Sequence, residues 1–242
     1  MFDHVTLRVD DLADASRALA AVLDELEIKQ NTNTPDFSVW GNFALTQTDE
    51  EHPIAQRVHV AFVAPTPAYV ERFGRAGVDA GFTDNGPVIP RPDYADDYYT
   101  ETLKDGAGNT FEAVHHDGER PRGNIDHVAI RVTDVESSAA FYSTIGPAAG
   151  LTIRHQTNDR AAFSVGASDG SLLVIAGEPT QNLHVAFSGQ DDDVRRFHAD
   201  ATAAGYRSNG EPGERPRYHD GYHAAYVVDP DGNNIEVVDH HR

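Results

Sequence analysis

Short runs of alternating apolar and polar residues predict β-strands along much of the chain. In the first run, residues 5–9, every second residue is Val or Leu, and His4 comes directly before it. Because successive side chains of a strand point to opposite faces, we expect the apolar residues to face a helix-covered core. The runs at 58–64, 126–132 and 183–188 repeat this pattern, and each places a His near the start of its other face.

Apolar residues at helical spacing follow each of these four strands and predict four helices. The first extends from Asp11 to about Leu26, and the others lie near 66–76, 134–146 and 190–204. Further short strands are expected at 38–40, 43–47, 98–104, 109–115, 151–155, 161–165 and 171–176 and in a closing hairpin over 222–239. The order βαβββ thus occurs four times, which predicts an α+β fold whose short sheets carry helices on one face.

The second half of the chain repeats the first. The strand start Phe2-Asp3-His4-Val5 recurs as Ile125-Asp126-His127-Val128, Val58–Phe62 as Leu183–Phe187, and Asp105–Val114 as Asp229–Val238. Three matches in the same order, at offsets of 123 (His4 to His127), 125 (His59 to His184) and 124 (Glu112 to Glu236), indicate a tandem duplication. We therefore expect two domains, 1–118 and 124–242, each of two βαβββ units, with a linker at 119–123.

The closing hairpin places a carboxylate inside an apolar strand. Its turn sequence Asp229-Pro230-Asp231-Gly232 contains Pro, which fixes φ, and Gly, which tolerates a positive φ. Glu236 follows in the second strand, between Ile and Val. Burial of a carboxylate there is costly unless a cation meets it.

Each half supplies two histidines at strand starts and one Glu in its last strand. These residues are His4, His59 and Glu112 in the first half and His127, His184 and Glu236 in the second. Two imidazoles and a carboxylate, with other coordination positions open, form the set that non-haem Fe(II) favours and that Mn(II), Zn(II) or Ni(II) also use. Because the whole pattern occurs twice, we expect it to bind a divalent metal, with Fe(II) favoured.

These motifs resemble the vicinal oxygen chelate superfamily, which includes glyoxalase I, extradiol ring-cleavage dioxygenases, fosfomycin-modifying enzymes and bleomycin-binding proteins. The resemblance covers essentially the whole chain and rests on the doubled βαβββ plan, the Asp-His-Val strand starts, the Leu/Val-His-Val-Ala-Phe strands and the motif Tyr226-x-x-Asp229-Pro230-x-Gly232-x-x-x-Glu236. It implies that paired units curl into half-barrel cups that each hold one ion. Pairing within each half gives the two sets named above, whereas pairing across the duplication gives His4/His184/Glu236 and His127/His59/Glu112.

The second half also resembles the extradiol dioxygenase pattern, from which it departs at Arg217 and Ala225. By that resemblance His219 and Tyr226 would orient the substrate oxygens and assist proton transfer. Tyr226 is equally compatible with a half-buried strand aromatic. It can lie opposite Glu236 only if the turn has an odd number of residues or contains a bulge.

Three functions fit these features, each with a small molecule as the partner. The favoured one is O₂-dependent cleavage of a catechol-like ring, and the second is a lyase, isomerase or transferase of the glyoxalase or fosfomycin type. Glyoxalase I would call for a fourth protein ligand, and the sequence has no cluster of Lys or Arg for a phosphonate. The third is a binding protein of the bleomycin-resistance kind, against which the retained metal ligands argue.

Charge and composition indicate which partners and which cellular location to expect. The chain has 39 acidic and 19 basic residues, a net charge of −20, which disfavours nucleic acid and anionic membranes as partners. The acids are spread along the whole chain, which favours a halophilic cell in which salt screens their repulsion. The absence of Cys excludes disulfides and thiolate metal sites. With no apolar run of membrane-spanning length and no signal peptide, we expect a cytoplasmic monomer or homodimer.

Overall fold

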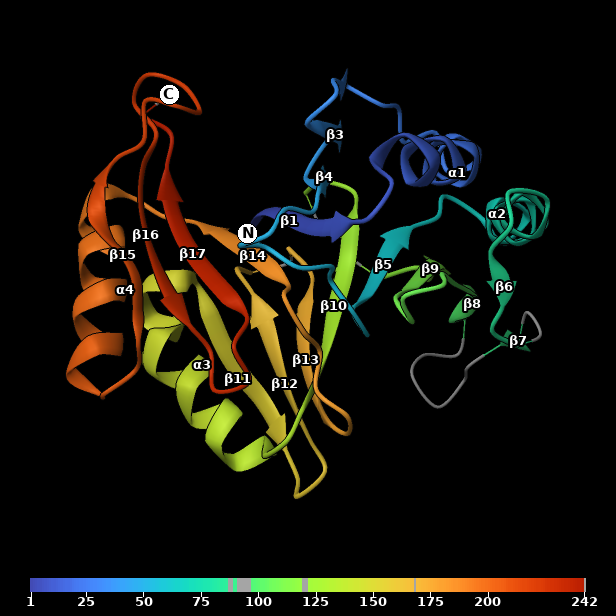
Figure 1. Ribbon diagram of the computed structural model, residues 1–242. Helices are drawn as coiled ribbons and strands as arrows, with labels where there is room; N and C mark the ends of the chain where they lie inside the picture. The colour runs from blue at the N-terminus through green and yellow to red at the C-terminus, as the bar shows by residue number, and fades with distance from the viewer. Residues whose placement is uncertain (87–88, 91–96, 119–121, 168, 242) are drawn as a thin grey trace.

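The computed structural model describes residues 1–86, 89–90, 97–118, 122–167 and 169–241, and it contains all four predicted units (Figure 1). The first unit comprises β1 (Phe2–Val9), α1 (Leu12–Glu25), β2 (Thr32–Asn33), β3 (Phe37–Trp40) and β4 (Phe43–Gln47). The second comprises β5 (His59–Val63), α2 (Pro67–Asp79), β6 (Thr83–Asp84), β7 (Ile89–Pro90), β8 (Tyr99–Lys104) and β9 (Thr110–His115). The third comprises β10 (Ile125–Val132), α3 (Val135–Ala149), β11 (Leu151–Gln156), β12 (Arg160–Val165) and β13 (Ser171–Ala176). The fourth comprises β14 (His184–Ser188), α4 (Asp191–Ala203), β15 (Ser208–Glu214), β16 (His223–Val228) and β17 (Asn234–Asp239).

Helices α1 and α3 each begin directly after an Asp that caps them. The side chains of Asp11 and Asp134 accept hydrogen bonds from backbone N–H groups in the first turns of α1 and α3. Helix α3 continues to Ala149, past its predicted end at residue 146. Pro147 lies within its last turn instead of ending it, and the helix ends at Gly150, at φ 68°. The strands that sequence periodicity missed, β2, β6, β7 and β15, are short or carry little apolar alternation.

Two sheets form, and each joins one unit from each half. The first sheet has the strand order β15-β16-β17-β14-β1-β4-β3-β2, and the second has β11-β12-β13-β10-β5-β9-β8-β6. Antiparallel pairs of β1 with β14 and of β10 with β5 connect the halves. The units therefore pair across the duplication. Of the proposed linker at 119–123, residues 119–121 lie outside the described residues.

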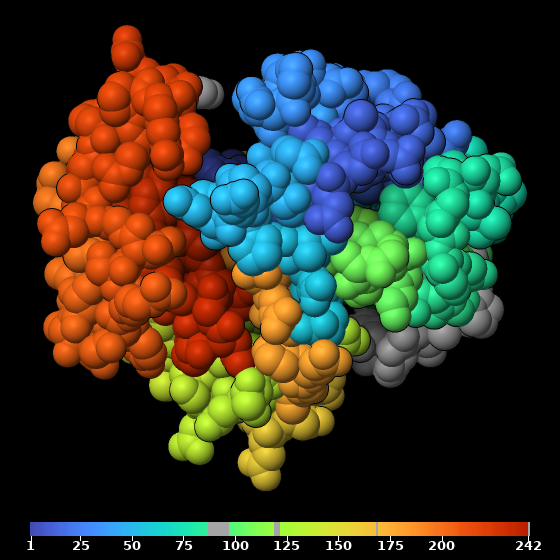
Figure 2. All heavy atoms as spheres, in the orientation of Figure 1, coloured from blue at the N-terminus to red at the C-terminus, as the bar shows by residue number. Residues whose placement is uncertain are grey.

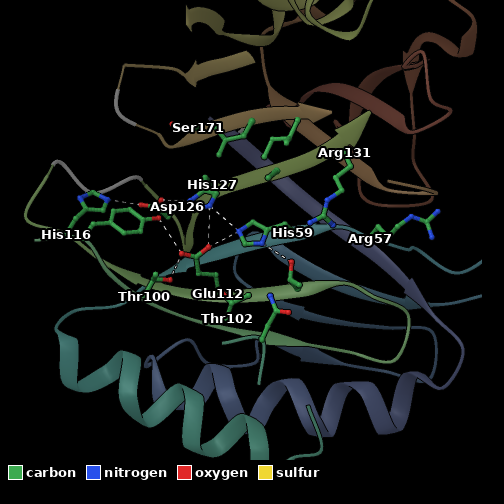
Figure 3. Close-up of a pocket in the computed structure, with 16 residues that line it drawn as sticks. Arg57, His59, Thr100, Thr102, Glu112, His116, Asp126, His127, Arg131 and Ser171 are labelled. Carbon is green, nitrogen blue, oxygen red and sulfur yellow. Dashed lines mark hydrogen bonds and ion pairs between the residues drawn. The ribbon is translucent and has the colours of Figure 1, made fainter. Parts of the chain in front are cut away.

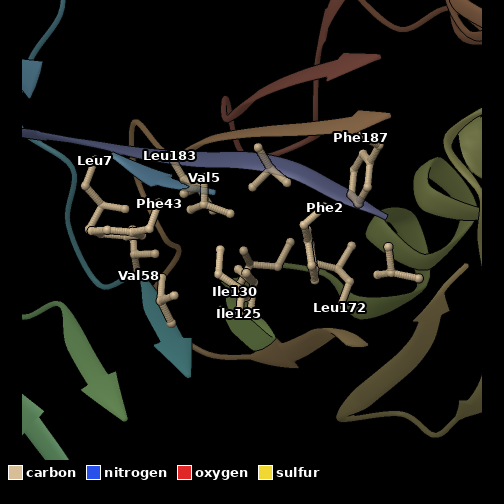
Figure 4. Packing of buried hydrophobic residues seen from close by; sticks show 14 of the residues in the cluster. Phe2, Val5, Leu7, Phe43, Val58, Ile125, Ile130, Leu172, Leu183 and Phe187 are labelled. Carbon is tan, nitrogen blue, oxygen red and sulfur yellow. The ribbon is translucent and has the colours of Figure 1, made fainter. Parts of the chain in front are cut away.

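The apolar faces of the two sheets pack against each other and against the helices. Phe2, Val5 and Leu7 of β1 are at most 1% exposed, and Figure 4 shows this strand above Ile125 and Ile130 of β10. Helices α1 and α2 contact each other, as do α3 and α4 (Figure 1). In each pair, the strands that precede the two helices belong to different sheets. The opposite, polar face of each sheet carries the histidines and forms the inside of a cup.

The ends of the chain meet in the first sheet. Figure 2 shows the N-terminal part in blue beside the C-terminal part in orange, with a hollow between them. Within the described part of the chain, no helix is both long enough and apolar enough to cross a membrane.

Candidate metal centres

The closing hairpin has the register that brings Tyr226 beside Glu236. The turn between β16 and β17 contains five residues, 229–233, and Tyr226 pairs directly with Glu236. Gly232 adopts φ 99°, and Asn233 is fully buried, where its side chain hydrogen-bonds Asp229. The odd-numbered turn therefore meets the condition set by the sequence for Tyr226 to face the same side as Glu236.

The first cup, defined by His4, His184 and Glu236, collects its residues from three neighbouring strands of the first sheet. The Nε2 atoms of His4 and His184 lie 3.1 Å apart. Glu236 Oε2 lies 3.0 Å from His184 Nε2 and 3.7 Å from His4 Nε2. Three potential ligand atoms thus point toward a common centre.

The second cup, defined by His59, Glu112 and His127, repeats this arrangement in the second sheet (Figure 3). Its two Nε2 atoms are 3.2 Å apart, and Glu112 Oε2 lies 2.8 Å from His59 and 3.6 Å from His127. The six histidines and glutamates singled out in the sequence are therefore brought together as two sets of three. Each set combines residues from both halves.

A carboxylate holds one histidine of each cup. His4 Nδ1 lies 2.9 Å from Asp3 Oδ1, and His127 Nδ1 lies 2.8 Å from Asp126 Oδ1. When Nδ1–H donates to the carboxylate, the Nε2 lone pair is left facing the centre of the cup. Histidines that bind metals are commonly held by a carboxylate in this way.

The other histidine of each cup has a polar neighbour at Nδ1. The hydroxyl of Thr110 lies 2.8 Å from His59 Nδ1, and the side-chain amide of Asn234 lies 2.9 Å from His184 Nδ1. The Thr110 hydroxyl can accept the Nδ1 proton of His59 and leave its Nε2 free for a metal. The Asn234 atom beside His184 is the amide nitrogen, which donates to Nδ1, so Nε2 of His184 is free for a metal when the amide is flipped to present its oxygen.

A further set of residues behind each cup, also copied by the duplication, was not predicted from the sequence. His240 Nε2 lies 2.9 Å from Asp3 Oδ2, and His116 Nε2 lies 3.0 Å from Asp126 Oδ2. The phenol of Tyr222 donates to Glu236 at 2.7 Å, and that of Tyr98 donates to Glu112 at 3.4 Å. These pairs share the offsets of the ligands, 123 for the Asp and 124 for the His and Tyr, which is the signal that could have found them.

The electrostatics of both cups favour an ionised carboxylate. Burial alone would raise the pKa of Glu112, but the His59 hydrogen bond and the charges of His127 and His59 lower it to about 2. The pKa of Glu236 is also lowered, since His184 and His4 outweigh the effect of burial. Burial lowers the pKa of His184 and thus favours the neutral imidazole that a metal requires.

The two expected catalytic residues occupy different positions relative to the first cup. The ring of Tyr226 lies 6.3 Å from that of His184, and its buried hydroxyl has no hydrogen-bond partner among the described residues. His219 is half-buried, and its Nε2 lies 2.9 Å from Nδ1 of His240. Through His240 and Asp3, His219 is linked to His4 by three hydrogen bonds.

A cavity of about 590 Å³ opens over the second cup and is lined by all three of its residues. Arg57 and Arg131 line the same cavity, on the side of His59 away from Glu112 in Figure 3. No cluster of basic residues is visible in the sequence, because these two arginines are far apart in the chain. Antiparallel pairing of β5 with β10 brings them together.

Arg131 is the less engaged of the two arginines. Its side chain is exposed and forms no ion pair within the described parts of the chain. Arg57 contacts the carbonyl oxygen of Pro179 at 2.9 Å and the carboxylate of Glu178 at 3.3 Å. The cavity therefore offers positive charge beside the His/His/Glu set.

The walls of the two cups differ. Thr100 and Thr102 face the second cup, whereas Ala224 and Tyr226 hold the matching positions in the first. In the first cup a buried apolar cluster forms next to Glu236 from Ala186, Tyr222, Ala224, Tyr226 and Val238. The second cup is thus the more polar of the two.

Comparison with known proteins identifies the second half. Residues 124–237 match the model of the Glyoxalase/Bleomycin resistance protein/Dioxygenase superfamily. This segment belongs to that superfamily. The first half repeats its βαβββ units and its His/His/Glu residues, so the resemblance inferred from the motifs is confirmed. Members of the superfamily typically use a divalent metal, which fits the donor atoms in both cups.

Solved structures extend the likeness in fold to the whole chain. Glyoxalase I from Zea mays is 17% identical, with a TM-score of 0.70 over 99% of this chain and 92% of its own. A mutant of that same enzyme is 19% identical, with a TM-score of 0.71 over 99% and 94%. A putative dioxygenase from Bacillus subtilis is 15% identical, with a TM-score of 0.67 over 98% and 84%. No curated protein matches the chain.

Proposed function

We propose that this protein is a divalent-metal-dependent enzyme and that the cavity over the second cup is its principal active site. The observation that carries the proposal is one cavity of about 590 Å³ lined by a complete His/His/Glu set and by two arginines. An ion bound to His59, Glu112 and His127 would act as a Lewis acid on substrate oxygens.

The residues around this set define the class of substrate. Arg57 and Arg131 suit a carboxylate or phosphonate group, because a guanidinium binds planar or tetrahedral anions through several N–H groups. The hydroxyls of Thr102 and Ser171 add neutral hydrogen-bonding groups to the wall. A small molecule with an anionic group and two further, adjacent oxygens would be held with the anionic group at the arginines and the two adjacent oxygens toward His59.

For this cavity we favour a lyase, isomerase or transferase reaction in which a carbonyl or epoxide oxygen is polarised. The anion-binding arginines support it, and Thr102 stands where the extradiol pattern has a Tyr. The phenol of Tyr98, hydrogen-bonded to Glu112, is a group that can give or receive a proton at the edge of the cavity.

The first cup supports a second candidate, O₂-dependent cleavage of a catechol-like ring with Fe(II). Tyr226 lies directly across from Glu236, and its buried hydroxyl lacks a hydrogen-bond partner within the described chain. A buried hydroxyl without a partner is suited to a substrate oxygen. His219 would then act on the cup as a positioning residue, through His240 and Asp3 and through its ring contact with Tyr222.

Metal analysis of three proteins tests the proposal. Wild type should bind one divalent ion per cup, and E112Q and E236Q should each lose one. Wild-type protein with no stoichiometric metal at these residues would contradict both enzyme functions and leave the binding-protein alternative.

Activity assays then separate the two candidate reactions. Anionic carbonyl and epoxide substrates should be turned over by E236Q but not by E112Q. O₂ uptake with a catechol panel, after anaerobic Fe(II) loading, should fail in E236Q if the first cup cleaves rings.

A further inference from the structure

A third cluster of metal-ligating atoms lies outside both cups, on the fourth unit. It consists of Asp191 at the start of α4, His223 at the start of β16 and His241 just beyond the end of β17. One ligand atom of each residue lies within 4.8 Å of the other two. One ion with bonds of about 2.0–2.2 Å can span such a set after small side-chain movements.

His223 provides the clearest indication that this cluster accommodates a ligand. Its side chain is 11% exposed, and its Nδ1 atom is buried without a hydrogen-bond partner within the described chain. That atom nevertheless lies 2.5 Å from Oδ1 of Asp191, outside hydrogen-bond alignment. With Nδ1 unprotonated, these two lone-pair atoms repel each other at this distance, and a cation bound between them, with a small movement of the side chains apart, would satisfy both.

His241 completes the set from the C-terminal end of the chain. Its Nε2 atom lies 2.9 Å from the same oxygen of Asp191, and its ring stacks on that of His223 at 6.0 Å with an interplanar angle of 13°. Arg195 contacts the other oxygen of Asp191, at 3.6 Å, so Oδ1 remains available to the two imidazoles.

The surrounding charge suits a dication. Asp239 Oδ2 lies 3.4 Å from His241 Nε2, and Glu214 Oε1 lies 4.0 Å from its Nδ1. The N-terminus of α4 carries a partial positive charge that stabilises Asp191 but opposes a cation. The three carboxylates of Asp191, Asp239 and Glu214 carry more charge than that partial charge and the Arg195 guanidinium together.

This cluster is not a relic of the duplication. Shifted by 124 residues, its positions in the first half hold Pro67, Tyr99 and Asp117, which cannot form a His/His/Asp set. The set is therefore specific to the fourth unit and separate from both cups.

We propose that Asp191, His223 and His241 form a third divalent-metal site, of the type that Zn²⁺ occupies. Two imidazoles and a carboxylate, with water completing the shell, suit zinc. A bound ion would tie the C-terminal end of the chain to α4 and β16. It would thereby also hold the adjacent His240, which contacts Asp3 behind the first cup.

Zinc titration of the full-length protein, followed by metal analysis, tests this site. H241A is the informative variant, because His241 is 39% exposed and its loss leaves the core intact. Wild type should bind one Zn²⁺ per chain more than H241A, and D191N should show the same loss. The rise in melting temperature on adding Zn²⁺ should be smaller in both variants.

The matched control is H52A. His52 is also exposed and contacts Asp49, at 2.8 Å, but belongs to no three-residue cluster within the described residues. Equal zinc stoichiometry in wild type and H241A would overturn the proposal, as would an equal loss in H52A. E112Q and E236Q should retain the His241-dependent ion, so failure of the cups to bind metal remains distinguishable from failure of this site.

Discussion

The aspartates behind the cup histidines explain why the two histidines of a cup are not equivalent. Asp126 accepts from His127 and also contacts His116, and these contacts outweigh burial to hold its pKa well below the usual range. His127 therefore carries a fixed tautomer, whereas His59 relies on a hydroxyl. An anion behind a ligand also raises the basicity of that ligand.

Replacing Asp126 with Asn should weaken metal binding at the second cup by about 10–100-fold, because the imidazole loses its anionic partner. Titration of the apo-protein with Mn²⁺ or Zn²⁺ measures the affinity. D79N, a change at an exposed Asp on α2, should leave the affinity unchanged. An unchanged affinity in D126N would show that Asp126 does not support a metal ligand.

The pKa of a second buried carboxylate, that of Glu101, is raised, whereas the pKa of Glu112 is lowered. Glu101 of β8 is 5% exposed and faces α2 beside Gly74. Burial raises its pKa to about 7, from an ordinary value of 4.5, and the charge and hydrogen bond of Asp84 add to the effect. The folded protein therefore binds this proton more tightly than the unfolded chain does.

The sign of the resulting pH dependence follows from that raised pKa. Glu101 contributes stability that is fully present below about pH 4.5 and is lost as the pH rises through about 7. E101Q should therefore be more stable than wild type at pH 8, and the difference should shrink at pH 5. Urea unfolding at both values measures it. E51Q, at an exposed Glu, should show no such trend.

At the scale of elements, one buried Asn fixes each turn against a ligand-bearing strand. Asn233 accepts from the backbone N–H of Leu183, directly before His184, and Asn109 accepts from that of Val58, directly before His59. Both Asn side chains are fully buried and also contact the Asp that begins their turn. The turns thereby fix where Glu112 and Glu236 lie along their strands relative to the histidines of the neighbouring strand.

Replacing Asn233 with Ala should destabilise the fold by about 1–3 kcal/mol, because it leaves a buried N–H without a partner. Chemical unfolding of N233A against wild type measures this loss, and N158A, at an exposed Asn, serves as the control. We also expect weaker metal binding at the first cup only. A loss of stability as small as that of N158A would contradict this role.

Local pattern predicted the elements that carry the ligands but not how they join. Alternation identified β1, β5, β10 and β14, and the repeat identified the six His and Glu residues that the structure brings together in the two cups. Neither could decide which unit pairs with which, because β5 and β14 have nearly the same sequence and either could pair with β1 locally. The arginines of the cavity and the contact of His240 with Asp3 depend on that pairing, so they could not be foreseen.

For the whole molecule, the net charge of −20 is spread over a structure with few basic partners. Self-repulsion of this size destabilises the compact state and is screened by salt. Raising KCl from about 0.1 to about 1 M shortens the Debye length from about 10 to about 3 Å and should raise the melting temperature. Sucrose at equal osmolality serves as the control. An equal rise with sucrose would exclude charge screening as the cause.

Pairing across the duplication also governs when each cup can assemble during synthesis. The second cup needs the chain as far as His127 for its His/His/Glu set and as far as β13 for its sheet, whereas the first needs both His4, in β1, and Glu236, in β17. Domains usually fold as they leave the ribosome, N-terminal first. Here β1 emerges well before its partner β14, which follows more than 170 residues later. A stalled or truncated chain would therefore expose an unpaired central strand and invite aggregation or capture by chaperones.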